Sequence, residues 1–256
     1  KEGFHTYFGF PLVFKDRLKG VLELFHRQPL DPDQEWLDFY ETLAGQAAMA
    51  VENAQLITGL HQANEDLIQA YDATIEGWSM AMDLRDKETE GHTLRVTDMT
   101  IALARKLNLS EFEIVHVRRG ALLHDIGKVG VPDSILLKPG LLTPEERQII
   151  EKHPVYAFNM LQSITYLRPA LDIPHLHHEK WDGSGYPYGL KGEQIPLTAR
   201  LFALVDVYDA LTSDRPYRPA WSKDETITYI REQSGRHFDP TLVSLFLEYL
   251  QENPDL

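Results

Sequence analysis

From about Ala73 to its end, the sequence is a succession of helix-forming segments separated by short breaks rich in proline and glycine. Three of these breaks read VGVPDSILLKPGLLTPEE, DGSGYPYGLKGEQIP and SDRPYRPAW. Because proline and glycine interrupt helices, and because no convincing strand pair occurs between the breaks, this part is predicted to be all-α. One helix is expected to begin after Thr143, since a proline and two glutamates follow it in the order that favours a helix N-terminus.

The N-terminal part contains the one convincing strand pair of the sequence. Between Tyr7 and His26, apolar residues alternate on both sides of the turn segment KDRLKG, a pattern typical of a β-hairpin. Asp33 is a suitable N-cap for a helix that continues through WLDFYETLAGQAAMAVENAQLI. A two-stranded hairpin with one helix is too small to be stable alone, so residues 1–55 are interpreted as the end of a domain that begins upstream of Lys1.

Residues 56–80 are predicted to form a helical linker. Their apolar residues step by four and three, which is the a/d spacing of a two-stranded coiled coil. This seam consists of Leu56, Leu60, Ala63, Leu67, Ala70 and Thr74. An amphipathic helix that packs on its own domain explains the short seam equally well. If the linker dimerises, it carries a signal from residues 1–55 into a second domain at residues 81–256, whose helical start reaches back as far as residue 72.

Charge and composition exclude several classes of partner. The formal net charge of −14 does not provide the basic patch that a phosphate backbone requires, so DNA and RNA polymers are not expected to bind. No apolar run approaches the roughly 20 residues of a membrane-spanning helix, so no part of this segment is expected in a membrane. The sequence has no cysteine, which is compatible with the reducing cytoplasm, the predicted location. Any metal ion must therefore bind to His, Asp and Glu.

Two segments have the residue types and the spacing of metal ligands. Glu88 and His92 are four residues apart and share one helix face, so both side chains can reach one metal ion. His124 and Asp125 are adjacent in LLHDIGK, where apolar neighbours create a need for a partner that offsets their desolvation. Lys128 lies one helical turn after His124 and can hold a phosphate oxygen on the same side.

Histidines and aspartates further along the chain are additional candidate ligands. His153 lies between two predicted helices, and His177 and His178 end a helix before the loop EKWDGSGYP. Adjacent helical residues point about 100° apart, so the two histidines serve either two neighbouring metal ions or one ion with different reach. Asp206 and Asp209 share a helix face within an apolar run. One of them is expected to be a ligand and the other to bind a neighbouring backbone group.

The candidate ligands are five imidazoles and at least three carboxylates, with no sulfur. Mixed nitrogen and oxygen ligands suit iron, manganese, zinc or cobalt better than calcium or magnesium, which prefer oxygen alone. Eight ligands exceed the need of one ion, so the sequence predicts a centre of two or three transition-metal ions. Such centres activate a bridging hydroxide and stabilise both oxygens of a phosphoryl displacement.

The stretches HDIGK, HHEKWDGSGYP and VDVYDALTSDRPYR, in this order, resemble the HD-GYP family of HD metal-dependent phosphohydrolases. The resemblance covers about residues 72–256. It implies an all-helical HD-type bundle that hydrolyses the bacterial second messenger cyclic di-GMP to pGpG or onward to GMP. The metal ligands that it implies are Glu88, His92, His124, Asp125, His153, His177, His178 and Asp206.

The same resemblance assigns roles around the metal ions. Glu88 implies the subclass with three ions, of which iron and manganese are the expected elements. Asp125 is implied to bridge two ions and to act in catalysis together with Lys128. Substrate contacts are implied for Lys128, Gly185, Tyr186, Pro187, Arg215 and Arg218. Family members often carry Lys where Arg218 stands, and this difference changes the hydrogen-bonding geometry.

The N-terminal segments GFPLVFKDRLKGVLELFHR and FYETLAGQAAMAVENAQL are similar to the last hairpin and the closing helix of a GAF sensory domain. The expected fold class is therefore mainly α, with an HD-type bundle preceded by a hairpin-plus-helix fragment of an α/β GAF domain. This similarity implies a sensor whose signal passes through the linker, within a homodimer and with signalling partner proteins.

Two functions other than cyclic di-GMP hydrolysis stay open at the level of the sequence. One is a receptor that binds cyclic di-GMP without cleaving it, and the other is an HD phosphohydrolase that acts on a different cyclic dinucleotide. In the loop HHEKWDGSGYP, Gly183, Gly185 and Pro187 are expected to shape a backbone that brings Tyr186 beside the dinucleotide. Trp181 is expected to pack, and Asp182 is expected to brace the turn.

Overall fold

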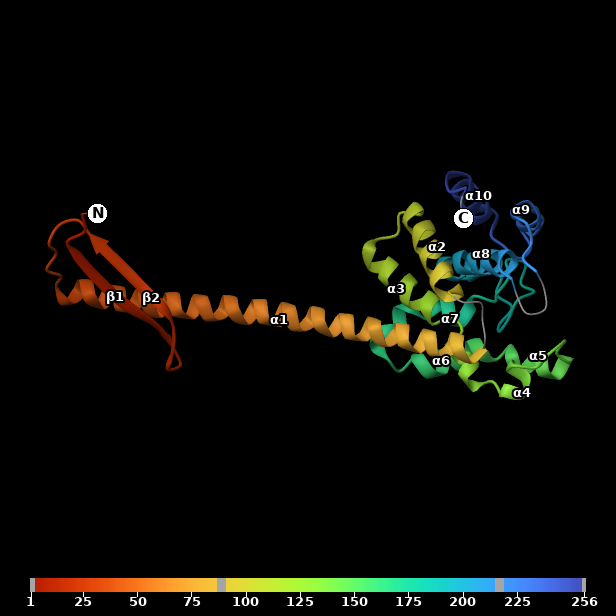
Figure 1. The fold of residues 1–256 in the computed structure, drawn as a ribbon, viewed down its shortest axis with the longest axis horizontal. Helices are drawn as coiled ribbons and strands as arrows, with labels where there is room; N and C mark the ends of the chain where they lie inside the picture. Colours follow the sequence, from red (N-terminus) through yellow and green to blue (C-terminus); the bar gives the residue numbers. More distant parts are fainter. Residues whose placement is uncertain (1–2, 87–90, 215–218, 255–256) are drawn as a thin grey trace. The chain divides into compact units, whose positions relative to one another are not determined.

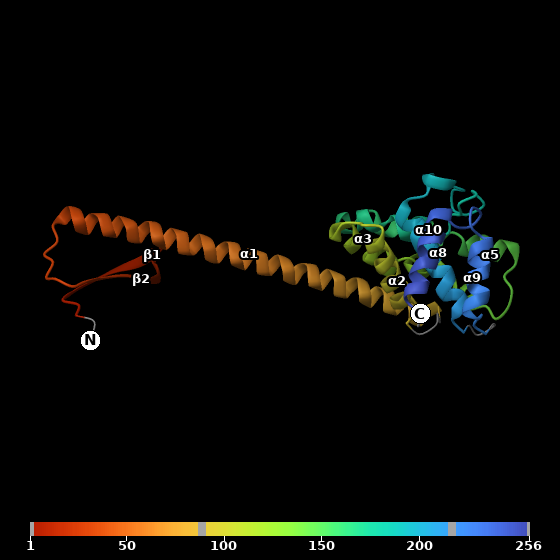
Figure 2. The same cartoon turned by 90° about the horizontal axis from the view of Figure 1, so that it is seen from above.

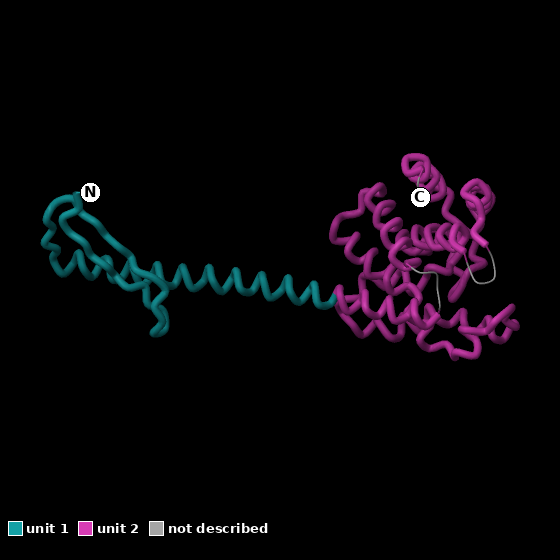
Figure 3. The backbone as a smooth tube through the Cα atoms, in the orientation of Figure 1, with its two compact units in different colours: residues 1–71 teal, residues 72–256 magenta. Residues whose placement is uncertain are grey.

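A computed structural model of the chain describes residues 3–86, 91–214 and 219–254. The chain divides into two compact units, Lys1–Tyr71 and Asp72–Leu256 (Figure 3). We call them the N-terminal unit and the C-terminal unit. The predicted ligand Glu88 and the predicted substrate contacts Arg215 and Arg218 lie outside the described residues.

The N-terminal unit begins with the predicted β-hairpin, formed by β1 (Thr6–Phe14) and β2 (Arg17–His26) in antiparallel pairing. The turn is shorter than the six-residue segment that the sequence indicates. It consists of Lys15 and Asp16 alone, with φ angles of 45° and 61°. Two-residue turns with positive φ at both positions match the twist of a hairpin, and residues 17–20 are therefore free to pair within β2.

After the hairpin, α1 (Gln34–Asp86) is a single helix of 53 residues. Asp33 is its N-cap, as predicted, and accepts a hydrogen bond of 2.8 Å from the Trp36 N–H. The boundary between the two units lies within this helix. Residues 53–71 are exposed on every side, whereas burial of single side chains resumes from Asp72 onward. The exposure contradicts packing of residues 56–71 of the predicted linker on their own domain, whereas Ile75 of the same linker is buried in an apolar cluster with Leu122 and Leu123.

The described part of the C-terminal unit is helical, as predicted, apart from one isolated bridge between Ser234 and Phe238. Its elements after α1 are α2 (His92–Lys106), α3 (Glu111–Leu122), η1 (Ile126–Gly130), α4 (Asp133–Leu136), α5 (Pro144–Ile150), α6 (His153–Leu161), η2 (Thr165–Ala170), α7 (Asp172–Leu176), η3 (Gly192–Gln194), α8 (Leu197–Thr212), α9 (Lys223–Glu232) and α10 (Pro240–Glu252) (Figure 1). The predicted cap of α5 is confirmed, because the Thr143 hydroxyl accepts the Glu146 N–H and Pro144 is the first helical residue.

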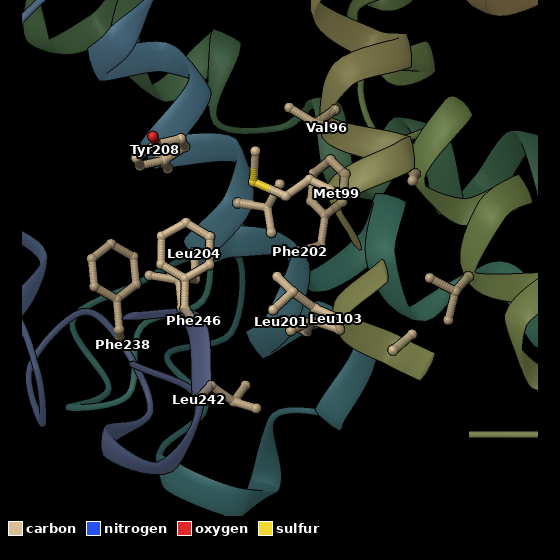
Figure 4. Close-up of a cluster of buried hydrophobic side chains, with 14 of the residues drawn as sticks. Val96, Met99, Leu103, Leu201, Phe202, Leu204, Tyr208, Phe238, Leu242 and Phe246 are labelled. Atoms are coloured by element: carbon tan, nitrogen blue, oxygen red, sulfur yellow. The ribbon is translucent and has the colours of Figure 1, made fainter. Parts of the chain in front are cut away.

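The main core of the C-terminal unit lies where α2, α8 and α10 pack together (Figures 1 and 2). Val96, Met99 and Leu103 of α2 lie close to the α8 residues Leu201 and Phe202 (Figure 4). Because protein interiors are close-packed, this apolar contact fixes the side of α8 that bears Asp206. The Phe202 ring also reaches the candidate ligands, with its centroid 4.9 Å from that of His124.

Among the described residues, no helix is both long enough and apolar enough to cross a membrane. This includes α1, whose exposed stretch carries charged residues between the apolar ones.

Candidate metal centre

The predicted ligands within the described residues come together from several separate elements of the C-terminal unit. His92 begins α2, His153 begins α6, and Asp206 lies within α8. His124 and Asp125 lie in the turn between α3 and η1, while His177 and His178 directly follow α7. These ligands form two groups, in each of which the potential ligand atoms lie within 4.8 Å of one another. The first ligand group is Asp125, His153, His177 and His178, and the second ligand group is His92, His124 and Asp206.

Three histidines are held in one tautomer by the main chain. In His124, His153 and His177, Nδ1 lies 2.8, 2.8 and 2.9 Å from a carbonyl oxygen three or four residues earlier. A carbonyl oxygen only accepts hydrogen bonds, so Nδ1 carries the proton and Nε2 of the neutral ring presents a lone pair. All three Nε2 atoms are buried and have no hydrogen-bond partner within the part of the chain that the structure describes. Buried polar atoms without a partner are costly, so these three nitrogens indicate where a cation could bind.

His92 is held by a carboxylate instead of a carbonyl. Its Nδ1 donates a hydrogen bond of 2.7 Å to Asp209 Oδ2, and its Nε2 lies 3.4 Å from Asp206 Oδ1. Asp209 in turn accepts hydrogen bonds of 2.6 and 2.9 Å from the Arg95 guanidinium. A carboxylate behind a histidine orients the ring and strengthens it as a metal ligand. The prediction that the second aspartate of α8 binds a backbone group is therefore wrong, because its side chain bonds to side chains.

Asp125 lies between the two ligand groups. Its Oδ2 is 3.0 Å from His124 Nε2 and its Oδ1 is 3.3 Å from His153 Nε2, but neither nitrogen makes a hydrogen bond with it. Burial disfavours the charge of this carboxyl, yet the positive charge of Lys128 outweighs burial and holds the pKa of Asp125 well below its usual range. Each oxygen of an ionised Asp125 thus faces a different ligand group, which is the arrangement of a bridging ligand.

The adjacent histidines lie in an environment that keeps them neutral. Burial and the neighbouring histidines His124 and His153 lower the pKa of His177 to about 3. Burial and the neighbouring rings also hold the pKa of His178 well below its usual range. Only a neutral imidazole can bind a metal ion. Of the two arrangements that the sequence allows for this pair, the structure favours both rings at one site, because both belong to the first ligand group.

This set of donors fits a transition-metal centre. Neutral imidazole nitrogens together with ionised carboxylates are the ligands that iron, manganese, zinc and cobalt accept. Burial disfavours the charge of Asp206, but the neighbouring His92 ring holds the pKa of Asp206 below its usual range, so this carboxylate is ionised as well. The described residues therefore supply two groups of donors that could hold metal, while Glu88, the residue predicted to bind a third ion, lies outside them.

Lys128 places its ammonium group beside the candidate bridging ligand. It lies in η1, and its Nζ is 2.7 Å from Asp125 Oδ2 and 2.9 Å from Asp86 Oδ2. The sequence argument identified Lys128 but not Asp86, although Asp86 immediately precedes the segment KETEGH, which contains the two predicted ligands Glu88 and His92. A cation at this position can neutralise an anionic group of a substrate bound at the metal centre.

The loop that follows His178 is shaped by one glycine. A Cβ atom on Gly185 would lie only 2.3 Å from the Lys180 nitrogen and 2.5 Å from the His178 oxygen, so only glycine fits. The next residue, Tyr186, donates its N–H to the His178 carbonyl, and its ring centroid lies 4.7 Å from that of His178. Burial raises the pKa of Tyr186, so its phenol stays neutral. The Tyr186–Pro187 peptide bond is cis.

Glu179 is a structural residue of this loop that the sequence argument left without a role. It is 2% exposed and accepts hydrogen bonds of 2.7 and 2.9 Å from the N–H groups of Tyr188 and Leu190. The feature of the sequence that could have identified Glu179 is its position directly after His177 and His178. Asp182 braces the turn as predicted, by accepting the Ser184 N–H at 2.9 Å. The partly buried Trp181 lies with its ring 5.6 Å from the Arg200 guanidinium.

Comparison with known proteins adds family information to this geometry. A family model described as HD domain matches residues 76–242. A cyclic di-GMP phosphodiesterase of Vibrio cholerae serotype O1 is 42% identical over 214 residues, which cover 78% of this chain and 44% of that protein. A 3′3′-cGAMP-specific phosphodiesterase 2 of the same organism is 36% identical over 247 residues, which cover 94% of this chain and 45% of that protein.

Among solved structures, Bd1817, an HDG"Y"P protein from Bdellovibrio bacteriovorus, matches with a TM-score of 0.53 and 18% identity. The match covers 97% of this chain and 94% of that one, and at this identity it shows a shared fold. The chain spans about half the length of the curated relatives that it matches.

Proposed function

This chain belongs to the HD domain family, and from that premise we propose that it is a metal-dependent phosphodiesterase that hydrolyses cyclic di-GMP to pGpG or GMP. The observation that carries the proposal is the set of three buried Nε2 atoms of His124, His153 and His177, which have no hydrogen-bond partner among the described residues. Two of these atoms, in His124 and His153, face an ionised Asp125. The relative named cyclic di-GMP phosphodiesterase, at 42% identity, supports the choice of substrate.

Different residues of the chain would have different roles in such a reaction. When bound, transition-metal ions supply hydroxide from water at neutral pH and neutralise charge on phosphoryl oxygens. His92, His124, His153, His177, His178, Asp125 and Asp206 would hold these ions. Lys128 can donate a hydrogen bond from Nζ to a phosphoryl oxygen. Tyr186, with its neutral phenol, would form a wall of the substrate pocket beside His178. Asp209 and Arg95 hold the proton of His92 on Nδ1 and so leave Nε2 for metal.

We also propose that the centre binds three metal ions and that Glu88 is a ligand of the third. Iron or manganese is the proposed element. Arg215 and Arg218 are proposed to contact the phosphates or the guanine edges of the substrate, together with Gly185 and Pro187 of the loop. The measurement that addresses the count is the metal content per chain after anaerobic reconstitution. Three ions in the wild type and two in Glu88→Ala would support the trinuclear centre, and two in the wild type would refute it.

The second candidate substrate is 3′3′-cGAMP. One observation favours it: the relative named for this substrate matches 94% of the chain, more than the relative named for cyclic di-GMP. The two dinucleotides differ in one base, so a comparison of their kcat/KM values decides which one is the natural substrate. A higher kcat/KM for cyclic di-GMP supports the main proposal, whereas a higher value for 3′3′-cGAMP replaces it. A metal-loaded chain that binds either dinucleotide without cleaving it is a receptor.

The N-terminal unit is proposed to be the end of a GAF sensory domain that signals through α1 in a homodimer. Leu56, Leu60 and Leu67, which belong to the predicted seam, are 61%, 72% and 51% exposed, and burial of these side chains in a partner helix would stabilise a dimer. Sedimentation at several protein concentrations tests this idea, with a Leu60→Glu variant expected to be monomeric. Signalling partner proteins and a cytoplasmic location stay predictions from the sequence.

The decisive test of the proposed function is hydrolysis by the metal-loaded wild type, with products separated by chromatography. His124→Ala is the matched variant because it removes a ligand of the second group without touching Lys128 or the loop. We expect it to lose metal and hydrolysis while its helical circular dichroism stays near that of the wild type. Full hydrolysis with retained metal in this variant would contradict the proposal.

A further inference from the structure

The C-terminal unit has a pocket of about 210 Å³ whose described lining residues all lie outside the two ligand groups. We call it the α3–α7 pocket, because residues of these two helices line much of it. The helices approach closely beside it, since a Cβ atom on Gly120 would lie 2.6 Å from the Ala170 oxygen and 3.2 Å from Ile173 Cβ. Phe112 and His116 are eight and four residues before Gly120, so they share the face of α3 that meets α7.

His116 has two ring nitrogens without partners at this pocket. Its Nδ1 and Nε2 atoms are both buried, and neither has a hydrogen-bond partner among the described residues. Burial and then the charge of Arg119 lower the pKa of His116, so the ring is neutral and has one N–H donor and one lone pair. Buried polar groups in native proteins are nearly always satisfied. An imidazole with two unsatisfied nitrogens therefore indicates a ligand that supplies a partner.

The α3–α7 pocket combines negative charge with apolar walls. Glu113 and Asp172 provide carboxyl groups, and no lysine or arginine is among the described residues that line the pocket. Hydrogen bonds from Ser110 lower the pKa of Glu113, so this group is ionised. Such a lining repels phosphates and attracts a cation. The apolar surface comes from Leu109, Phe112, Val117 and Ile173.

Asp172 gives a second reason to expect a cationic ligand. Burial raises the pKa of the Asp172 carboxyl group, and a ligand cation beside this group would offset the cost of its charge. A metal ion is not expected in the pocket, because three or more potential ligand atoms of the described residues lie within 4.8 Å of one another only in the two ligand groups. The apolar walls instead suit a cation that carries an organic body.

The volume of the pocket sets the size of this organic body. A cavity of about 150 Å³ holds benzene, so the α3–α7 pocket has room for one ring with a short chain. Access to His116 depends on Phe112, whose ring lies edge-on to the imidazole with 4.6 Å between the centroids. Phe112 is 72% exposed. Because this ring is not packed into the core, it can turn and open the way to the imidazole.

We propose that the α3–α7 pocket binds a small organic ammonium ion, which donates hydrogen bonds to the Asp172 carboxylate and to the lone pair of His116 while its apolar body packs against Phe112 and Ile173. The inference does not rest on the proposed function, because none of the described lining residues is a predicted metal ligand or substrate contact. Its place in the fold is between two helices that lead directly to metal ligands, since α3 precedes His124 and α7 precedes His177.

Phenethylamine is a suitable probe, with 2-phenylethanol and phenylacetate as neutral and anionic controls of similar shape. Binding to the full chain is measured near neutral pH from the NMR signals of labelled histidine rings, with a chelator present so that the amine cannot act as a metal ligand. We expect phenethylamine to bind about 10-fold more tightly than 2-phenylethanol, and phenylacetate to bind most weakly. An amine that does not bind, or that binds no more tightly than the alcohol, would overturn the inference.

Two variants test where the amine binds. Asp172→Asn should lower the affinity for phenethylamine to that for 2-phenylethanol, while unchanged binding of the alcohol shows that the pocket is intact. His116→Phe keeps a ring but removes both nitrogens, so the affinity for both probes should fall. Asp98→Asn is the matched control, because Asp98 is an exposed carboxylate of α2 outside the pocket lining, and it should change nothing. If Asp172→Asn or His116→Phe bound phenethylamine as tightly as the wild type, the amine would occupy another place and the inference would be wrong.

Discussion

The two ligand groups differ in one histidine, because His92 of the second group is oriented by a side chain whereas His124 of the same group is oriented by a main-chain carbonyl. In the first ligand group, His153 and His177 donate Nδ1–H to main-chain carbonyls. In the second ligand group, His92 donates Nδ1–H to the Asp209 carboxylate, which the Arg95 side chain holds in turn. A carbonyl cannot be removed by a substitution, whereas a carboxylate can. The comparison teaches that the second ligand group depends in part on a side-chain network, through His92, whereas His124 of that group and His153 and His177 of the first depend on the path of the backbone.

The largest expected effect comes from Asp125, the residue that faces both groups. Asp125→Asn keeps the size of the side chain but removes the charge that both groups share. We expect hydrolysis of cyclic di-GMP to fall by at least ~100-fold. This is more than the usual effect of removing a residue that only supports a metal ligand. Metal analysis should show loss from both groups, with helical circular dichroism retained. Loss of a single ion would mean that Asp125 does not bridge the groups.

Asp209→Asn is expected to affect the second ligand group and to leave the first unchanged. The Asn oxygen can still accept the His92 Nδ1–H, but the charge that pairs with Arg95 is lost. We expect the affinity for one metal ion to fall by about 10-fold to 100-fold and the affinity for the other to stay unchanged. Chelator competition with Mn²⁺ resolves the two binding steps. An equal loss at both steps would show that the groups are not independent and would remove the distinction drawn above.

The pH dependence of stability gives a smaller effect, which depends on the first ligand group. Burial lowers the pKa of His177 to about 3 in the folded chain, whereas an unperturbed histidine titrates near 6.5. Between these values the unfolded chain binds the proton and the folded chain does not, so the stability of the metal-free protein falls as the pH drops below about 6.5. Urea unfolding at pH 7 and pH 5 measures this fall.

His177→Gln should show a smaller loss of stability between the same two pH values, because the residue that takes up the proton on unfolding is absent. A control with His61→Gln, on the exposed part of α1, should lose as much stability as the wild type. If the wild type and His177→Gln lost equal stability, the buried neutral state of His177 would be disproved.

Glu179→Gln has the smallest expected effect, since it changes the loop beside the first ligand group and no ligand. The buried carboxylate accepts two N–H groups, and the amide can accept only with its oxygen, so we expect a loss of about 1–3 kcal/mol in unfolding free energy. KM for the dinucleotide should rise a few-fold because the loop that carries Tyr186 is held less firmly at Tyr188 and Leu190, and metal content should stay constant. A loss of metal in this variant would place Glu179 within the metal centre.

Residue types and their order predict much of this molecule, because some signals are local. Proline and glycine breaks predict the helical C-terminal unit, and adjacent polar residues within apolar runs, such as His124 and Asp125, predict candidate ligands. The side chains that support the ligands could not be predicted in this way. Asp209 contacts a histidine 117 positions earlier and Asp86 contacts a lysine 42 positions later. Such partners depend on how helices pack, and spacing along the chain contains no signal for them.

The length of the hairpin turn and the extent of α1 were also not predicted correctly from the sequence. The segment KDRLKG contains several turn-forming residues, yet strand pairing recruits Arg17 to Gly20 into β2. The prediction of a linker bounded at residues 56 and 80 follows from spacing, whereas α1 runs from Gln34 to Asp86 without interruption. In both cases hydrogen bonds of the backbone continue past the point where side-chain patterns change.

The central claim is that the two ligand groups bind metal and that the bound metal makes the chain a phosphodiesterase. The most direct measurement reconstitutes the full chain anaerobically with iron or manganese, counts the ions per chain, and follows cyclic di-GMP by chromatography. The account predicts at least two ions per chain, conversion to pGpG or GMP, and loss of both on chelation. Hydrolysis that persists in fully chelated protein, or a metal-loaded chain that leaves the dinucleotides intact, would contradict it.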